Sequence, residues 1–295
     1  MSVAGLLNVD KPSGITSRDV VNVVQKIVRP AKAGHAGTLD PLASGVLVVC
    51  VGRATRLIEY VQRMPKHYSA TFVLGQQSPT DDVEGDVTSL DAPPIPSRAE
   101  VGAAIEPFRG KIMQRPPAYS AIRVQGRRAY DLARRGKPPQ LEPRPVTIHR
   151  LEVVAYDYPK LQLDIQCGSG TYVRALGRDI AERLGTAAVM SALQRTAIGS
   201  FTVEQAIALE AISAKHLDDV LLPPVRAVEA LSQVRLSERQ LEQVGHGRPI
   251  RLDTQLQEAI SDEVVALDTR GNLAAILKPE IGGDWRPSRN FLPAQ

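Results

Sequence analysis

Residues 34–51 have the sequence GHAGTLDPLASGVLVVCV, a glycine-rich loop that runs directly into an uninterrupted apolar segment. The apolar part, Gly45–Val51, predicts a strand buried on both faces. Within the loop, Asp40 precedes Pro41, and a residue before proline is driven away from helical backbone angles. The stretch therefore predicts an acidic side chain on a loop that is anchored to the rigid centre of the fold.

Two amphipathic segments predict helices. Valine and isoleucine recur at helical spacing over Ser17–Val28, with Ser17 as the candidate N-cap and Pro30 just past the end. A second helix is expected within GSGTYVRALGRDIAERLG, where Thr171 is the candidate N-cap and Gly185 the candidate C-cap. The chain thus combines helices with strands.

Alternation of apolar and polar residues over 66–74 and 161–167 predicts two half-buried strands. The sequence pattern changes after the proline-containing segment LLPPVRAVEA, and we place a domain boundary near residue 230, giving domains of residues 1–230 and 231–295. The smaller domain is predicted to hold a helix at Ser237–Val244 and strands at Val264–Leu267 and Leu273–Leu277. Such a β-rich unit suits docking better than catalysis.

The net charge of +4 is unevenly distributed along the chain. Residues 109–150 contain nine arginines and two lysines against Asp131 and Glu142, a net charge of +9, so the remainder carries −5. Concentrated arginine favours a polyanionic partner, and a solvated basic face is the alternative. We expect this segment to form an exposed, mobile arm.

Asp40 and Arg174 are the strongest candidates for a charged site. Arg174 lies in the first turn of a predicted helix, where the helix dipole disfavours a cation, so a buried carboxylate should hold it, and Asp40 is our candidate. The alternatives are a simple Asx turn for Asp40 and an unpaired surface position for Arg174. Tyr68 and Tyr172 each begin a regular element and are either half-buried core residues or part of the same site.

The remaining composition argues against several classes of protein. Cys50 and Cys167 lie in apolar strand-like runs and are predicted to be buried free thiols, and the five isolated histidines show no metal-ligand spacing. No apolar run approaches the roughly eighteen residues of a membrane span, and the first residues lack the basic start of a secretory signal. We therefore expect a cytoplasmic protein.

Six segments closely resemble, in order and spacing, the bacterial TruB family of tRNA pseudouridine synthases. They are NVDKPSGITS, GHAGTLDPLASGVL, KHYSATFVLG, PPAYSAIRVQGRRAYDLARRG, GTYVRALGRDIAERLG and LQRTAIGSF, which together extend from about Gly5 to Phe201. The tail resembles the small PUA-like RNA-binding domain of that family. One departure is Ala36, which replaces a threonine that is usual in the family.

The resemblance implies an α+β pseudouridine-synthase fold, with a mixed, largely antiparallel sheet, flanking helices and a small PUA-like β-rich domain at the C-terminus. It implies isomerisation of uridine 55 in the T loop of tRNA to pseudouridine, after the base has been flipped out. The reaction involves no redox step and no group transfer, so neither a cofactor nor a catalytic metal is expected. The expected partner is the T arm of tRNA, with no membrane and no obligate protein partner.

The family's catalytic residues carry over by position. Asp40 matches the essential aspartate, which acts as a nucleophile or a base. Arg174 matches the arginine that pairs with that aspartate. Tyr68 matches the tyrosine whose ring stacks on the target base, and we expect its hydroxyl to take part in removing the proton from C5.

Substrate-binding residues carry over in the same way. Tyr172 and Leu193 match residues that line the same pocket, and His35 matches the histidine that helps to hold the everted loop. The basic arm, residues 109–150, matches the family's thumb, which closes over RNA. Its expected phosphate contacts are Arg127, Arg128, Arg134 and Arg135.

Two other functions are compatible with these motifs. Related guide-RNA-dependent pseudouridine synthases carry the same catalytic core but work in a complex with partner proteins. The second alternative is a tRNA-folding chaperone whose isomerase activity is incidental. The presence of Asp40, Tyr68 and Arg174 together argues against a purely binding role.

Overall fold

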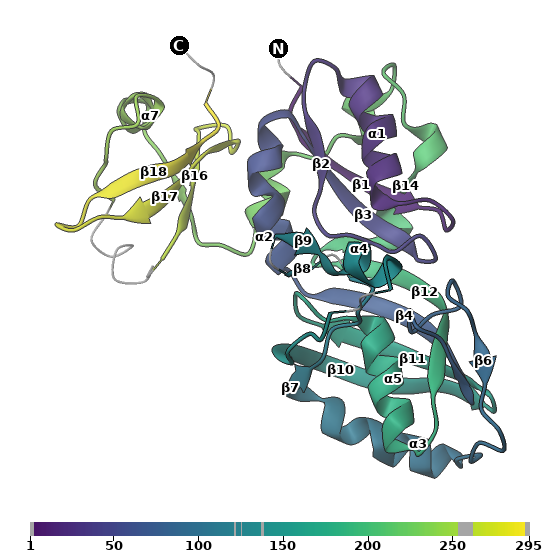
Figure 1. Cartoon of the computed structure of the whole chain (residues 1–295). Coiled ribbons are helices and arrows are strands. Elements are labelled where there is room, and N and C mark those ends of the chain that lie inside the picture. The colour runs from purple at the N-terminus through teal and green to yellow at the C-terminus, as the bar shows by residue number, and fades with distance from the viewer. Residues whose placement is uncertain (1–2, 121, 125, 137–138, 253–261, 293–295) are drawn as a thin grey trace.

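A ten-stranded sheet forms the body of the protein (Figure 1). The computed structural model describes residues 3–120, 122–124, 126–136, 139–252 and 262–292. Along the sheet the strands follow the order β14, β1, β3, β12, β4, β11, β10 and β7, with β2 beside β3 and β13 beside β12. Two of the described pairings, β1 with β14 and β3 with β12, are parallel and the others antiparallel, which confirms a mixed, largely antiparallel sheet. The strands are β1 (Gly5–Lys11), β2 (Ala33–His35), β3 (Ser44–Val51), β4 (Lys66–Leu74), β7 (Gly110–Gln114), β10 (Arg144–Asp157), β11 (Lys160–Cys167), β12 (Ala188–Ile198), β13 (Phe201–Thr202) and β14 (Ile207–Ala208).

The two predicted strand patterns reflect two positions in this sheet. In β3 every residue from Gly45 to Val51 is buried, because apolar side chains cover both of its faces, as the continuous apolar run predicts. In β4 and β11 buried and partly exposed residues alternate, because apolar packing covers one face. Helices α3 (Arg98–Ile105) and α5 (Val173–Arg183) supply that cover.

Helix α1 (Ser17–Val28) has the predicted bounds but a different N-cap. Thr16 is the cap: its hydroxyl accepts from the backbone N–H of Asp19, whose carboxylate accepts from the backbone N–H of Thr16. The prediction of Ser17 as the cap is wrong, because the Ser17 side chain is buried and bonds Leu39 instead.

Helix α5 also has a different N-cap from the predicted one, and it begins one residue later than the predicted cap implies. Tyr172 is the N-cap and makes no side-chain capping bond, while the Thr171 hydroxyl donates to the carbonyl of Gly168, so the prediction of Thr171 as the cap is wrong. At the other end Leu184 is the C-cap, and Gly185 follows it with φ +72°. Glycine adopts this left-handed conformation without steric cost, so Gly185 ends the helix, one position beyond the observed cap and not as the cap that was predicted.

The basic segment 109–150 is only partly an arm. Its two ends pair with each other in the main sheet, as β7 and the first part of β10. Between them lie β8 (Arg123–Val124), β9 (Arg127–Arg128) and the short helix α4 (Ala129–Arg134), which cross the middle of the body in the view of Figure 1. From here on we use the word arm for the described residues of the segment 115–143.

The tail forms a second sheet, with β15 (Gln233–Arg235), β16 (Val264–Leu267), β17 (Leu273–Pro279) and β18 (Trp285–Asn290) in that order. Helix α7 (Glu238–Gly245) begins after Ser237, which caps it. Strands β15 and β18 are not predicted from the sequence. Val265, Leu267 and Ile276 of this sheet share one buried apolar cluster with Leu57 and Tyr60 of the body. The boundary near residue 230 stays a prediction, since this cluster joins the two parts.

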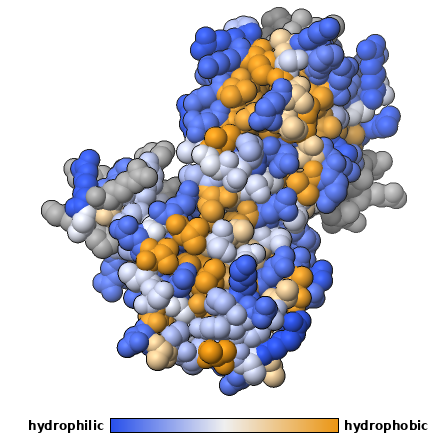
Figure 2. Space-filling model, turned by 90° about the vertical axis from the view of Figure 1, so that its right-hand side faces the viewer, coloured by the Kyte–Doolittle hydropathy of each residue, from blue (hydrophilic) through white to orange (hydrophobic). Residues whose placement is uncertain are grey.

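The other described elements are short. They are α2 (Ile58–Arg63), α6 (Leu217–Val220) and the hairpin of β5 (Gln76–Gln77) with β6 (Thr88–Ser89). On the face turned away from the tail, apolar side chains form several patches among polar ones (Figure 2). None of the helices in the described part of the chain has the length and apolar character needed to cross a membrane.

Candidate active site

A cavity of about 1570 Å³ opens between the body and the arm. Its wall includes all of the predicted site residues outside the arm, which come from β2, the following loop, β4, α5 with its N-cap, and β12. Tyr119, Ser120 and Tyr130 line it from the arm. Arg135 is exposed and is not part of this wall, and the side chains of Arg127, Arg128 and Arg134 lie outside the described residues. The predicted residues that line the cavity are His35, Asp40, Tyr68, Tyr172, Arg174 and Leu193.

The loop that carries Asp40 is fixed by hydrogen bonds on both sides of this residue. Ser17 Oγ accepts from the backbone N–H of Leu39 at 2.8 Å and lies 3.0 Å from its carbonyl oxygen. The carbonyl of Pro41 accepts from the backbone N–H of Gly14 at 2.8 Å and from Lys11 Nζ at 3.4 Å. Lys11 is fully buried, and desolvation is the main cause that lowers the pKa of its ammonium group. The loop is therefore anchored to β1 and α1.

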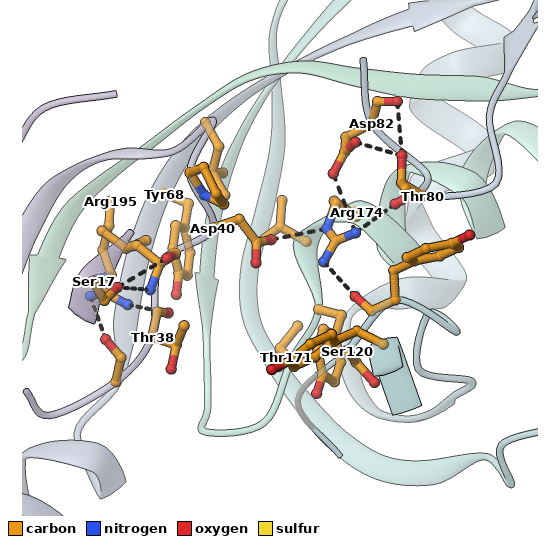
Figure 3. Close-up of a pocket in the computed structure, with 18 of the residues that line it drawn as sticks. Ser17, Thr38, Asp40, Tyr68, Thr80, Asp82, Ser120, Thr171, Arg174 and Arg195 are labelled. Carbon is orange, nitrogen blue, oxygen red and sulfur yellow. Dashed lines mark hydrogen bonds and ion pairs between the residues drawn. The ribbon is translucent and has the colours of Figure 1, made fainter. Parts of the chain in front are cut away.

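Arg174 and Asp40 form the ion pair that the sequence predicts. Arg174 Nε lies 3.0 Å from Asp40 Oδ2, and the arginine side chain is 7% exposed, whereas that of Asp40 is 37% exposed (Figure 3). The expectation of a buried carboxylate is wrong for Asp40, because this side chain reaches into the open cavity. One end of the pair is thus rigid and the other accessible to a substrate.

The buried carboxylate beside Arg174 belongs to Asp82, which sequence reasoning missed. Asp82 Oδ2 lies 3.3 Å from Arg174 Nη1 and its side chain is 4% exposed. Arg174 also donates to the carbonyls of Thr80 at 2.6 Å and Tyr119 at 3.1 Å. The guanidinium therefore connects Asp40, the acidic segment after β4, and the arm. The only sequence signal was the acidic composition of residues 75–108, which does not single out one carboxylate.

Tyr68 lies at the inner end of the cavity, directly opposite Arg195 in the pairing of β4 with β12. Burial raises the pKa of the Tyr68 phenol, and the positive charge of Arg195 opposes that rise. Lys66, two residues earlier on the same face, has its pKa lowered to about 8, mainly by burial and then by the charge of Arg195. Arg195, which also lines the cavity, is a second residue that sequence reasoning missed.

Tyr172 is held at the rim of the cavity by its neighbours. The side-chain amide of Gln114 accepts from the Tyr172 N–H at 2.8 Å and donates to the Tyr172 carbonyl at 3.0 Å. The guanidinium of Arg144 lies 5.0 Å from the centre of the Tyr172 ring, a cation–π distance. These contacts fix the position of the ring at the wall of the cavity.

Leu193 and His35 complete the wall on the side of the sheet. Leu193 is 8% exposed on β12. Burial, followed by the charge of Arg195, lowers the pKa of His35, which favours the neutral form of the imidazole. Among the described residues its Nδ1 has no hydrogen-bond partner, and no group of three or more His, Cys, Asp or Glu residues could hold a metal ion.

Two family models match consecutive parts of the chain. The model for the N-terminal domain of the TruB family pseudouridylate synthases matches residues 25–173, and that for the C-terminal domain of tRNA pseudouridylate synthase B matches residues 174–230. The tRNA pseudouridine synthase B of Dehalococcoides mccartyi strain CBDB1 is 37% identical, with 98% of this chain and 96% of the relative covered. The enzyme of the same name from Arthrobacter sp. strain FB24 is 39% identical, with 99% and 98% covered.

A solved structure, a Cbf5-Nop10-Gar1 complex, contains a chain of similar fold. The TM-score is 0.74 and the identity 26%, with 98% of this chain and 85% of that chain covered. Fold, cavity and sequence matches together define a pseudouridine synthase, an isomerase that acts on RNA. The chain belongs to the TruB family of pseudouridylate synthases.

Proposed function

We propose that the protein converts uridine 55 in the T loop of tRNA to pseudouridine, with Asp40 as the essential carboxylate. Support for tRNA comes from the names of the relatives, which are tRNA pseudouridine synthases B. The observation that carries the role of Asp40 is its position: it is ion-paired with a buried arginine, yet 37% exposed at the wall of the cavity. A buried salt bridge that served stability alone would not need an exposed carboxylate.

The proposed reaction needs no co-reactant. The bond between N1 and C1′ breaks, the uracil turns, a bond between C5 and C1′ forms, C5 loses its proton and N1 takes one up. A uridine inside a folded loop exposes neither C1′ nor C5, so the nucleotide has to be flipped into the cavity. Asp40 then meets the sugar or the base, Tyr68 and Tyr172 offer ring faces to the uracil, and Arg174 keeps the carboxylate aimed.

Two further features of the proposal concern the surroundings of the site. The net charge of +9 over residues 109–150 suits contacts to the phosphates of the T arm. We assign residues 231–295, whose described part contains the second sheet, to RNA docking. The two buried free cysteines suit a reducing compartment, so we place the reaction in the cytoplasm.

The likeness to the Cbf5 chain favours one alternative, an enzyme that works in a complex with partner proteins. Incubating the isolated protein with an unmodified T-arm stem-loop, and mapping pseudouridine by chemical labelling, decides between the two. We expect modification of U55 without added RNA or protein, and none in a stem-loop carrying cytidine at that position. Asp40→Ala should bind the stem-loop within a few-fold of wild type and show no turnover, whereas Asp157→Asn, at the end of β10, should react normally. Activity that requires added RNA or protein would contradict the proposal.

A further inference from the structure

Arg195, on β12, is a buried cation without an anionic partner. It is 1% exposed, and no carboxylate of the described residues lies within ion-pair distance of its guanidinium. Burying a charge costs stability unless hydrogen bonds or an opposite charge compensate for it. An apolar side chain would fill the same space with a smaller loss of stability. We therefore look for the role of the guanidinium in the groups that it contacts.

Those contacts are backbone carbonyls on two segments. Nε donates to the carbonyl of Val46 on β3 at 2.7 Å, which anchors the head group to the centre of the sheet. Nη2 donates to the carbonyl of Gly37 at 3.1 Å, and Nη1 lies 3.4 Å from the carbonyl of Thr38. Gly37 and Thr38 directly precede the loop residues Leu39 and Asp40. The planar fork of arginine holds this loop against β3 in a way that a lysine cannot.

The same guanidinium reaches Tyr68. Arg195 and Tyr68 are directly opposed residues of β12 and β4, and Figure 3 shows their side chains next to each other. The positive charge favours the ionised form of the phenol, against the effect of burial. One head group thus bonds the carbonyls of the Asp40 loop and acts on the phenol group of Tyr68.

We propose that Arg195 is a positioning residue that fixes the Asp40 loop and Tyr68 relative to each other, so that the carboxylate and the phenol meet the flipped uridine at one spacing. This inference rests on the proposed function. Within this loop Arg174 contacts only the carboxylate of Asp40, and Ser17 and Lys11 hold the later part of the loop. Arg195 alone among these links the loop to β4, through its opposed position to Tyr68.

The first test needs no RNA. In Arg195→Lys, amide hydrogen exchange of residues 37–40 should speed up, while exchange in β3 and the thermal midpoint stay close to wild type. Arg226→Lys, an arginine that pairs with Glu229 away from the cavity, is the matched control. Unchanged exchange in the loop would overturn the proposal, and so would a uniform increase across the sheet, which would assign Arg195 to general stability.

The second test measures, in single-turnover reactions on the T-arm stem-loop, how far the effects of substituting Arg195 and Tyr68 depend on each other. Arg195→Lys should slow the reaction roughly a hundredfold, the effect of misplacing a catalytic group by about 1 Å, while the affinity for RNA changes only a few-fold. In a Tyr68→Phe background the same substitution should cost about tenfold less than in wild type, because one of the two aligned groups has already been removed. Equal losses in both backgrounds would show that Arg195 does not act through Tyr68 and would overturn the proposal. A wild-type protein that modifies no uridine would instead overturn the proposed function, and the exchange experiment would still decide the role of Arg195.

Discussion

The buried carboxylate of Asp82 lies 3.3 Å from the guanidinium of Arg174, which is at the same time paired with the exposed carboxylate of Asp40. One cation is therefore shared by two anions, one inaccessible and one at the wall of the cavity. Thr80 Oγ1 donates to Asp82 Oδ1 at 2.6 Å and holds the buried carboxylate in place.

Removing the charge of Asp82 tests whether catalysis depends on the sharing of Arg174 between Asp82 and Asp40. In Asp82→Asn the full charge of Arg174 acts on Asp40, which makes that carboxylate a weaker nucleophile and base. We expect kcat to fall roughly tenfold, about 1.4 kcal/mol of transition-state stabilisation, with little change in the affinity for RNA. Single-turnover rates and a thermal melt check this, with Asp157→Asn as the control. A lowered melting temperature with an unchanged rate would limit Asp82 to a stabilising role.

Tyr68 can act through its ring or through its hydroxyl. Tyr68→Phe keeps stacking, and we expect it to bind RNA normally but to lose at least about a hundredfold in single-turnover rate, the low end of the contribution of a general base. Tyr68→Leu should in addition lose affinity, since stacking contributes ~1–3 kcal/mol per base. A near-normal rate in Tyr68→Phe would leave only the stacking role and would move the search for the proton acceptor to Asp40 or a water molecule.

The arm should carry much of the electrostatic affinity. If Arg127, Arg128, Arg134 and Arg135 contact phosphates, each lost contact should lower the slope of log K against log salt by roughly 0.7 to 0.9. Replacing all four with glutamine should weaken binding and flatten its salt dependence together. Titrations at several salt concentrations measure the slope, and an unchanged slope would mean that these arginines form a solvated basic face.

The tail should assist docking without forming the site. Every predicted pocket residue precedes residue 230, the last being Leu193, so a chain ending at Ala230 should keep its kcat at saturating RNA and show a raised KM. Its melting temperature should also fall, because Leu57 and Tyr60 lose their apolar cover from the tail sheet. Loss of kcat in a truncated chain that is well folded would contradict this division of labour.

The buried thiols predict a dependence of stability on pH. Burial raises the pKa of Cys50 to about 12 and that of Cys167 to about 11, while an unfolded chain ionises its thiols near pH 9. Above about pH 9 the unfolded state therefore binds fewer protons than the native state, and the free energy of unfolding should fall by up to about 1.4 kcal/mol per pH unit for each thiol. Urea unfolding of wild type and of the double variant Cys50→Ala, Cys167→Ala should show the smaller fall in the variant. The same slope in both would show that the thiols make no contribution.

Local patterns in the sequence predicted the regular elements well. The apolar run before Val51, the alternation in β4 and the amphipathic spacing of α1 each depend on neighbours within one element, so they are visible in the sequence. The helix caps were less well predicted, since Thr16 and Ser17 are both able to cap a helix and a contact with Leu39 decides between them. The six motifs in register identified the family, and with it the residues that line the cavity.

The sequence by itself determined the strands β3, β4, β11, β16 and β17, the helices α1, α5 and α7, the concentration of positive charge between residues 109 and 150, and the family. Only the tertiary structure decided which groups meet: Asp82 as the buried partner of Arg174, and Arg195 between the Asp40 loop and Tyr68. The physical reason is the order of the strands. The chain places β12 between β3 and β4, so side chains far apart in sequence become neighbours. Hydrogen bonds between such side chains and neighbouring strands or loops produce no periodic pattern in the sequence.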